Sequence, residues 1–309
     1  MKNNKSFTLV ETLAVITIIG ILSGFLILRF QESNYEAEFS RAKAFSLSVL
    51  MSLPVETVSE WKFDGPTTAG SSATLDDVKD TWGANDGVVV NGGTLIRDGV
   101  DCVSGKCLEF DGIDDFIRID HGQSLVLSGN YTISFWAYNG NGTATWPTLF
   151  NKRQQSTTNG YFWCYSSGTN EVNITHQWSS GSSTNSTVFY NVFDLNKWNY
   201  LVFTFNNSNK ILKLYKNGSY TNDPKTLTNA VSVIDGNLFL GTYNGSTSSS
   251  YPFKGKIDEF RIFNDVLTVS QINQMYLAGL DSLYLSNQIP KEEYNQRLSE
   301  LKMNLTKHE

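Results

Sequence analysis

The chain has 309 residues, of which 40% are hydrophobic and 17% charged, so it can bury the core of one large domain or two ordinary ones. Its formal net charge is −6 and it contains no basic cluster, which argues against nucleic acid as a partner. Aromatic residues make up 13%, and Ser, Thr and Asn gather in stretches such as SSGSSTNST, which favours a β-rich body with polar loops over an α/β enzyme.

The N-terminal part begins with an apolar run at 7–30 that contains no proline. As a helix it would be roughly 36 Å long, enough to cross a hydrocarbon core of about 30 Å. A cleaved signal peptide is the alternative, but its apolar region has only about 7 to 15 residues, so we expect a retained membrane helix. Lys2 and Lys5 favour a cytoplasmic N-terminus. This predicts a single-pass protein of the inner membrane whose body lies outside the cytoplasm.

Glu11 lies inside this apolar run, where an unpaired carboxylate is costly, so we expect it to have a functional role. An amphipathic extension of the helix follows at 31–55. Its apolar residues recur at spacings of three, four and seven, at Tyr35, Phe39, Ala42, Val49 and Leu53. Pro54 ends the pattern.

The stretch KSFTLVETLAVITIIGIL resembles the N-terminal signal of type IV pilins and type II secretion pseudopilins. The resemblance implies a leader at 1–6, cleavage by prepilin peptidase between Ser6 and Phe7, and methylation of the new amine of Phe7. It also implies that Glu11 neutralises that amine on a neighbouring subunit during filament assembly. Glycine usually precedes the cleaved bond, whereas this chain has Ser6, another small residue, so we still expect processing.

The body, 56–277, changes to a period of two. Stretches such as EWKFD, YTISFWAY, WNYLVFTFN and GKIDEFRIF alternate apolar and polar residues, which predicts short strands of an antiparallel sandwich or jelly roll. Asn217-Gly218 predicts a tight hairpin turn. Thr268 and Gln271 predict a capping box that opens a short helix. The tail, 278–309, predicts one further amphipathic helix; it leaves open whether this packs on the N-terminal helix, the sandwich or a partner.

The body also resembles the laminin-G-like, concanavalin A-like jelly roll, whose motifs match LEFDGIDDFIRI, LYKNG and GKIDEFRIFNDVLTVSQINQMY in order. The resemblance implies a mainly β fold, here preceded by a long N-terminal helix and followed by a short C-terminal one. Members of this family include sugar-binding modules, adhesion modules and glycoside hydrolases. The resemblance also implies a structural Ca²⁺ that ties the first strand to the last, which points to Asp64 and Asp258. Asp86, in GANDG, is a candidate for a further ligand. The alternative is that Asp258 and Glu259 cap a strand and face solvent.

Four aromatic residues near polar stretches are candidates for stacking on sugars, with core positions as the alternative: Trp146, Trp163, Trp178 and Tyr243. Cys102 and Cys107 are close enough in sequence to form a disulfide in an exported domain, or remain a reduced pair. Cys164 is expected to be a buried apolar residue.

Catalysis has weak support in the sequence. Glu109 and Asp111 resemble part of the carboxylate strand of laminarinase-type glycoside hydrolases, but Gly112 interrupts the strand. The three histidines are scattered, which disfavours a zinc site or a catalytic triad. We therefore expect no enzyme, and predict a pilin-like or pseudopilin-like filament subunit that displays a lectin-like domain for glycan binding or adhesion at the cell surface. The alternatives are a structural pseudopilin of a secretion or DNA-uptake machine and a membrane-tethered glycoside hydrolase.

Overall fold

The computed structural model describes residues 57–68, 70–91, 94–98, 101–139, 147–153, 161–166, 171–179, 182–221, 223–227, 236–244 and 251–305. The chain divides into two compact units, Met1–Ser48 and Val49–Glu309, and the described residues all belong to the second. The predicted leader, membrane helix and amphipathic extension lie outside the described residues. Within the described part, no helix is both long and apolar enough to cross a membrane.

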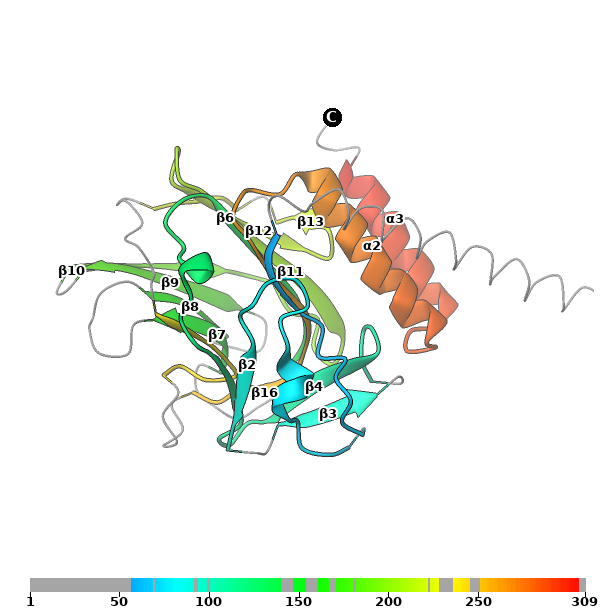
Figure 1. The fold of residues 1–309 in the computed structure, drawn as a ribbon. Helices are drawn as coiled ribbons and strands as arrows, with labels where there is room; N and C mark the ends of the chain where they lie inside the picture. Colours follow the sequence, from blue (N-terminus) through cyan, green and yellow to red (C-terminus); the bar gives the residue numbers. More distant parts are fainter. Residues whose placement is uncertain are drawn as a thin grey trace, which may run out of the picture. The chain divides into compact units, whose positions relative to one another are not determined.

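Two antiparallel sheets form the body of this unit (Figure 1). The first sheet contains β1 (Thr57–Trp61), β3 (Leu95–Asp98), β4 (Lys106–Asp111), β6 (Tyr131–Asn139), β11 (Trp198–Asn206), β12 (Ile211–Lys216), β13 (Ser219–Tyr220), β14 (Lys225–Thr226) and β16 (Lys254–Phe263). Its order is β13-β12-β11-β6-β16-β4-β3, while β1 pairs with β16 and β14 with β12. The first and last strands of the body are thus neighbours.

The second sheet contains β2 (Gly87–Val90), β5 (Phe116–Ile119), β7 (Thr148–Arg153), β8 (Tyr161–Tyr165), β9 (Val172–Ser179), β10 (Ser182–Phe189) and β15 (Asn237–Leu240). Its order is β10-β9-β8-β7-β15-β5-β2. Two short 3₁₀ helices, η1 (Leu75–Val78) and η2 (Gln123–Leu125), lie in the connections. The predicted mainly β sandwich is therefore confirmed.

The main core lies between the two sheets, because alternate residues of each strand point to the same face. Phe135 of β6 stacks on Phe260 of β16 with ring centroids 5.4 Å apart, and it meets Phe150 of the second sheet edge-on at 5.6 Å. Each such side chain contributes about 1.5–3 kcal/mol when fully buried. The alternation seen in the sequence is thus the pattern that closes the sandwich.

Two helices, α2 (Val269–Leu285) and α3 (Lys291–Leu305), run side by side against the outer face of the first sheet (Figure 1). Thr268 begins α2: the Gln271 N–H donates to its hydroxyl at 3.3 Å, and its own N–H donates to the Gln271 side chain at 2.7 Å, which confirms the predicted capping box. The helix continues past the expected domain boundary at residue 277, because Leu280 and Leu283 extend its buried face.

Candidate functional site

The outer face of the first sheet carries a second core beneath the helices. Trp136 of β6 stacks on Tyr276 of α2 with ring centroids 5.7 Å apart. A Cβ on Gly279 would lie 2.4 Å from Cζ2 of Trp136, so the helix comes this close only because residue 279 is a glycine. Burial raises the pKa of Tyr276 to about 12, which keeps its hydroxyl protonated at neutral pH.

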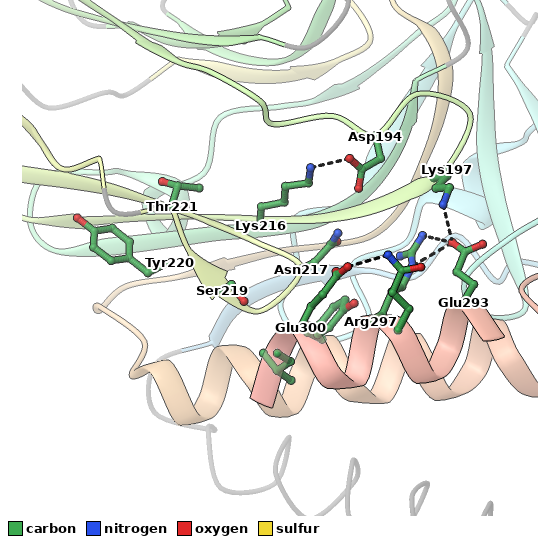
Figure 2. A pocket seen from close by; sticks show the side chains of 13 residues that line it. Asp194, Lys197, Lys216, Asn217, Ser219, Tyr220, Thr221, Glu293, Arg297 and Glu300 are labelled. Carbon is green, nitrogen blue, oxygen red and sulfur yellow. Dashed lines mark hydrogen bonds and ion pairs between the residues drawn. The ribbon is translucent and has the colours of Figure 1, made fainter. Parts of the chain in front are cut away.

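Beside this second core is a cavity of about 450 Å³, which we call the hairpin pocket. It lies between α3 and the turn that joins β12 to β13 (Figure 2). Asn217 and Gly218 form this turn with φ angles of 50° and 77°, which confirms the predicted tight hairpin. The side chain of Asn217 accepts the N–H of Tyr200 at 2.9 Å and so fixes the turn to β11.

Ion pairs set the electrostatics of the hairpin pocket (Figure 2). Lys216 binds Asp194 at 2.9 Å, and Glu293 of α3 binds Arg297 at 2.7 Å and Lys197 at 3.4 Å. Arg297 also donates to the carbonyl of Trp198 at 3.0 Å, which ties α3 to β11. The other polar groups that line the pocket are hydroxyls, amides and one carboxylate: Asn217, Ser219, Tyr220, Thr221, Tyr276, Gln296 and Glu300.

A second cavity, of about 410 Å³, opens on the outer face of the same sheet, over β4, β6 and β16; we call it the sheet-end pocket. Tyr138, Lys256 and Glu109 stand opposite one another on β6, β16 and β4, so they share one face. The ammonium of Lys256 lies 5.1 Å from the centroid of the Tyr138 ring. Glu109 forms an ion pair with Arg97 of β3.

Three aspartates lie close together where β4 leads into β5: Asp111, Asp114 and Asp115. Asp111 and Asp115 line the sheet-end pocket. Asp111 and Asp114 are exposed, whereas Asp115 is only 2% exposed. Burial, reinforced by the charges of Asp111 and Asp114, raises the pKa of Asp115 to about 6, although a hydrogen bond from the Asp111 N–H opposes the shift.

In the structure, the three predicted calcium ligands accept hydrogen bonds from backbone N–H groups. Asp258 is fully buried, so it does not face solvent, and it accepts the N–H groups of Val103 at 2.9 Å and Ser104 at 3.1 Å. Asp64 accepts the N–H of Lys106 at 2.7 Å. Asp86 instead binds the ammonium of Lys79 and the N–H of Asp80, both at 2.9 Å. Among the described residues these three carboxylates do not converge into one group, and calcium between Asp64 and Asp258 stays a prediction.

The loop held by Asp64 and Asp258 is closed by a disulfide between Cys102 and Cys107. The carbonyl of Cys102 accepts a hydrogen bond from Gln288, which follows α2. Cys164 is buried and free, as expected of an apolar core residue. The disulfide loop thus connects the buried Asp258 to the end of the helix.

Within the described part of the chain, the residues that line the two pockets include none of the predicted sugar-binding aromatics. Trp163 and Trp178 belong to the adjacent strands β8 and β9 of the second sheet, and Trp146 lies outside the described residues. Tyr243 is half-buried and packs edge-on against Tyr251, with ring centroids 5.7 Å apart. The processing and assembly residues Ser6, Phe7 and Glu11 also lie outside the described part of the chain.

Sequence reasoning missed several residues of the two pockets. Arg297 meets Trp198 across 99 positions of sequence, so no local pattern points to the contact. Lys254 and Lys256 did leave a signal, because they alternate with buried residues in β16. Asp115 belongs to the family motif LEFDGIDDFIRI, but the motif does not show that its side chain is buried, because the burial depends on neighbouring strands.

Residues 111–273 match the family model of the concanavalin A-like lectin/glucanases superfamily, and residues 1–27 match that of the prokaryotic N-terminal methylation motif. Both resemblances expected from the sequence are thereby confirmed. A comparison with curated proteins found no match.

Solved structures share the fold at low sequence identity. Domain 4 of AbnA, a GH43 extracellular arabinanase from Geobacillus stearothermophilus, in complex with arabinotriose, is 21% identical with a TM-score of 0.54, over 72% of this chain and 98% of that one. The binding domain of botulinum neurotoxin serotype G is 15% identical with a TM-score of 0.55, over 72% of this chain and 51% of that one. This chain therefore spans about half of the neurotoxin domain.

The superfamily model covers more than half of the chain, and its matched residues run from the end of β4 into α2. The two-sheet sandwich agrees with it. This protein therefore belongs to the concanavalin A-like lectin/glucanases superfamily and carries a prokaryotic N-terminal methylation motif.

Proposed function

We propose that this protein is a pilin-like or pseudopilin-like filament subunit that displays its sandwich outside the cytoplasm for glycan binding or adhesion. The observation that carries the proposal is the presence of a methylation motif and a lectin-type domain in one chain. In this proposal prepilin peptidase cleaves between Ser6 and Phe7, residues 7–30 anchor the subunit in the inner membrane, and Glu11 pairs with the Phe7 amine of a neighbouring subunit.

The hairpin pocket is the proposed glycan site. Its volume of about 450 Å³ falls within the range of about 300–1,000 Å³ typical of small-molecule sites. Sugar hydroxyls require donors and acceptors, which Asn217, Thr221 and Gln296 supply, and the ring of Tyr220 offers an apolar surface beside them. The paired charges of the pocket favour an uncharged or weakly charged saccharide.

A glycan array tests this site, using the full-length chain in detergent, followed by titration of the best ligand. We expect Tyr220→Ala to weaken binding by about tenfold or more, equivalent to about 1.4 kcal/mol. Tyr190→Ala is the matched control, because Tyr190 is a 61% exposed tyrosine outside the pocket, and it should leave affinity unchanged. An array without any hit would favour a structural pseudopilin that has no glycan ligand.

We propose that the carboxylates of the sheet-end pocket do not catalyse glycan hydrolysis. Glu109 is held by Arg97, and Asp111 accepts the N–H of Ile113 at 2.7 Å, so both carboxylates of the hydrolase-like stretch are already engaged. Glycan turnover that is lost in Glu109→Gln would instead establish the membrane-tethered glycoside hydrolase.

A further inference from the structure

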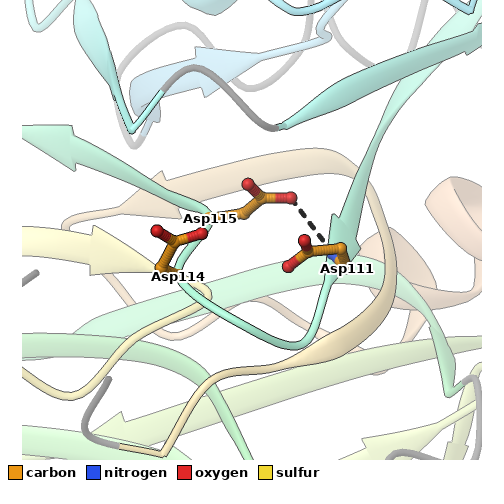
Figure 3. A group of neighbouring side chains, drawn as sticks. All are labelled: Asp111, Asp114 and Asp115. Atoms are coloured by element: carbon orange, nitrogen blue, oxygen red, sulfur yellow. Dashed lines mark hydrogen bonds between the residues drawn. The ribbon is translucent and has the colours of Figure 1, made fainter. Parts of the chain in front are cut away.

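The turn between β4 and β5 brings three carboxylates together (Figure 3). One oxygen from each of Asp111, Asp114 and Asp115 lies within 4.8 Å of the others. Among the described residues, no Lys or Arg forms an ion pair with any of the three. Lys254 of β16 stands opposite Asp111 in the sheet but forms no ion pair with it.

Asp115 supplies a second observation that points to a ligand. One of its oxygens, Oδ2, accepts the N–H of Asp111 at 3.1 Å. The other, Oδ1, is buried and has no hydrogen-bond partner among the described residues, although the side chain borders the sheet-end pocket. A buried carboxylate oxygen without a partner is costly, so such atoms normally bind a donor or a metal ion.

We infer that Asp111, Asp114 and Asp115 bind a Ca²⁺ ion at the edge of the sheet-end pocket. Ca²⁺ takes six to eight oxygens at about 2.4 Å, so two of its ligands can lie up to about 4.8 Å apart. The three carboxylate oxygens lie within this distance of one another. Water can supply the remaining ligands on the exposed side. Mg²⁺ demands octahedral geometry at about 2.1 Å, and zinc prefers histidine or cysteine, which this group lacks.

The ion would give Asp115 Oδ1 a ligand and would offset the charge of all three carboxylates. It would thereby fix the turn that leads from the first sheet into the second. This inference is independent of the proposed glycan binding, because it requires no residue of the hairpin pocket.

Calorimetric titration of CaCl₂ into the full-length chain in detergent, after removal of metal with EDTA, tests the site. We expect one ion per chain with a Kd of about 0.1–1 mM, the range of extracellular calcium modules. Asp114→Asn should weaken binding at least about tenfold, because it removes an exposed ligand without disturbing the core. Asp76→Asn, at an exposed aspartate in η1, is the matched control and should bind as the wild type does.

A second variant separates binding from a purely structural role. Asp115→Asn removes a buried charge, so its Tm without calcium should exceed that of the wild type, and CaCl₂ should raise it no further. The inference is overturned if the wild type shows no calcium binding, or if Asp114→Asn binds as well as Asp76→Asn. It is also overturned if Asp64→Asn abolishes binding while Asp114→Asn does not.

Discussion

Arg261 of β16 places its guanidinium between two buried carboxylates. It donates to Glu60 of β1 at 2.7 Å and to Glu259, and all three residues are at most 9% exposed. Lys62 lies 3.5 Å from Glu60, but without Arg261 its single positive charge would face the two negative charges of Glu60 and Glu259. We expect Arg261→Met to lower the free energy of unfolding by about 3 kcal/mol or more, because it leaves a buried carboxylate without a partner. Denaturant unfolding of the full-length chain measures the loss.

Arg118→Met is the matched control for this charge cluster. Arg118 binds Asp120 at 2.8 Å, but its side chain is 39% exposed and that of Asp120 is 63% exposed. Solvent screens such a pair, so we expect a loss below about 1 kcal/mol. Equal losses in the two variants would contradict the view that burial makes the Arg261 cluster important.

Between α2 and α3, the hydroxyl of Tyr294 donates to Asp281 at 2.7 Å. Burial raises the pKa of Asp281 above its ordinary value of 3.8, although this hydrogen bond opposes the shift. The folded state therefore binds the proton more tightly than the unfolded chain does. The stability from this group is complete below pH 3.8 and is lost as pH rises through the raised pKa.

Asp281→Asn keeps an acceptor for Tyr294 and removes the titration. We expect its Tm to exceed that of the wild type at about pH 7 and to match it near about pH 3. Thermal unfolding across this range measures the difference, with the exposed Asp76→Asn as a control that should show no such trend. A gain of the same size at both pH values would mean that packing, and not the charge, is responsible.

The elements that the sequence predicted well are those with local causes. The Asn217-Gly218 turn and the Thr268 capping box depend on residues within four positions of each other. The partner of α3 could not be predicted in this way: its stripe of Tyr294 and Leu301 is compatible with several surfaces. Tertiary contacts such as that of Arg297 with Trp198 place it on the sandwich, which creates the hairpin pocket.

At the scale of the whole molecule, the chain combines two kinds of sequence. The sandwich and its helices bury two apolar cores of their own, so fold and pockets follow from 57–305. Residues 1–27 carry the methylation motif. The domain already encloses its own apolar cores, so its folding does not require the apolar run of the motif. A mutation in the motif should therefore affect assembly and leave the folding of the sandwich unchanged.

Glu11 is the residue at which this separation can be tested. We expect Glu11→Ala and Glu11→Val to leave membrane insertion and cleavage largely intact, because neither shortens the apolar run nor alters the Ser6–Phe7 bond. Both should reduce filament assembly, since in the proposed pairing the Phe7 amine of the neighbouring subunit loses its partner. Mass spectrometry of the mature N-terminus reports cleavage, and filaments sheared from cells report assembly. Glu32→Ala removes a carboxylate beyond the apolar run and should assemble normally, whereas normal filaments from both Glu11 variants would contradict the assigned role.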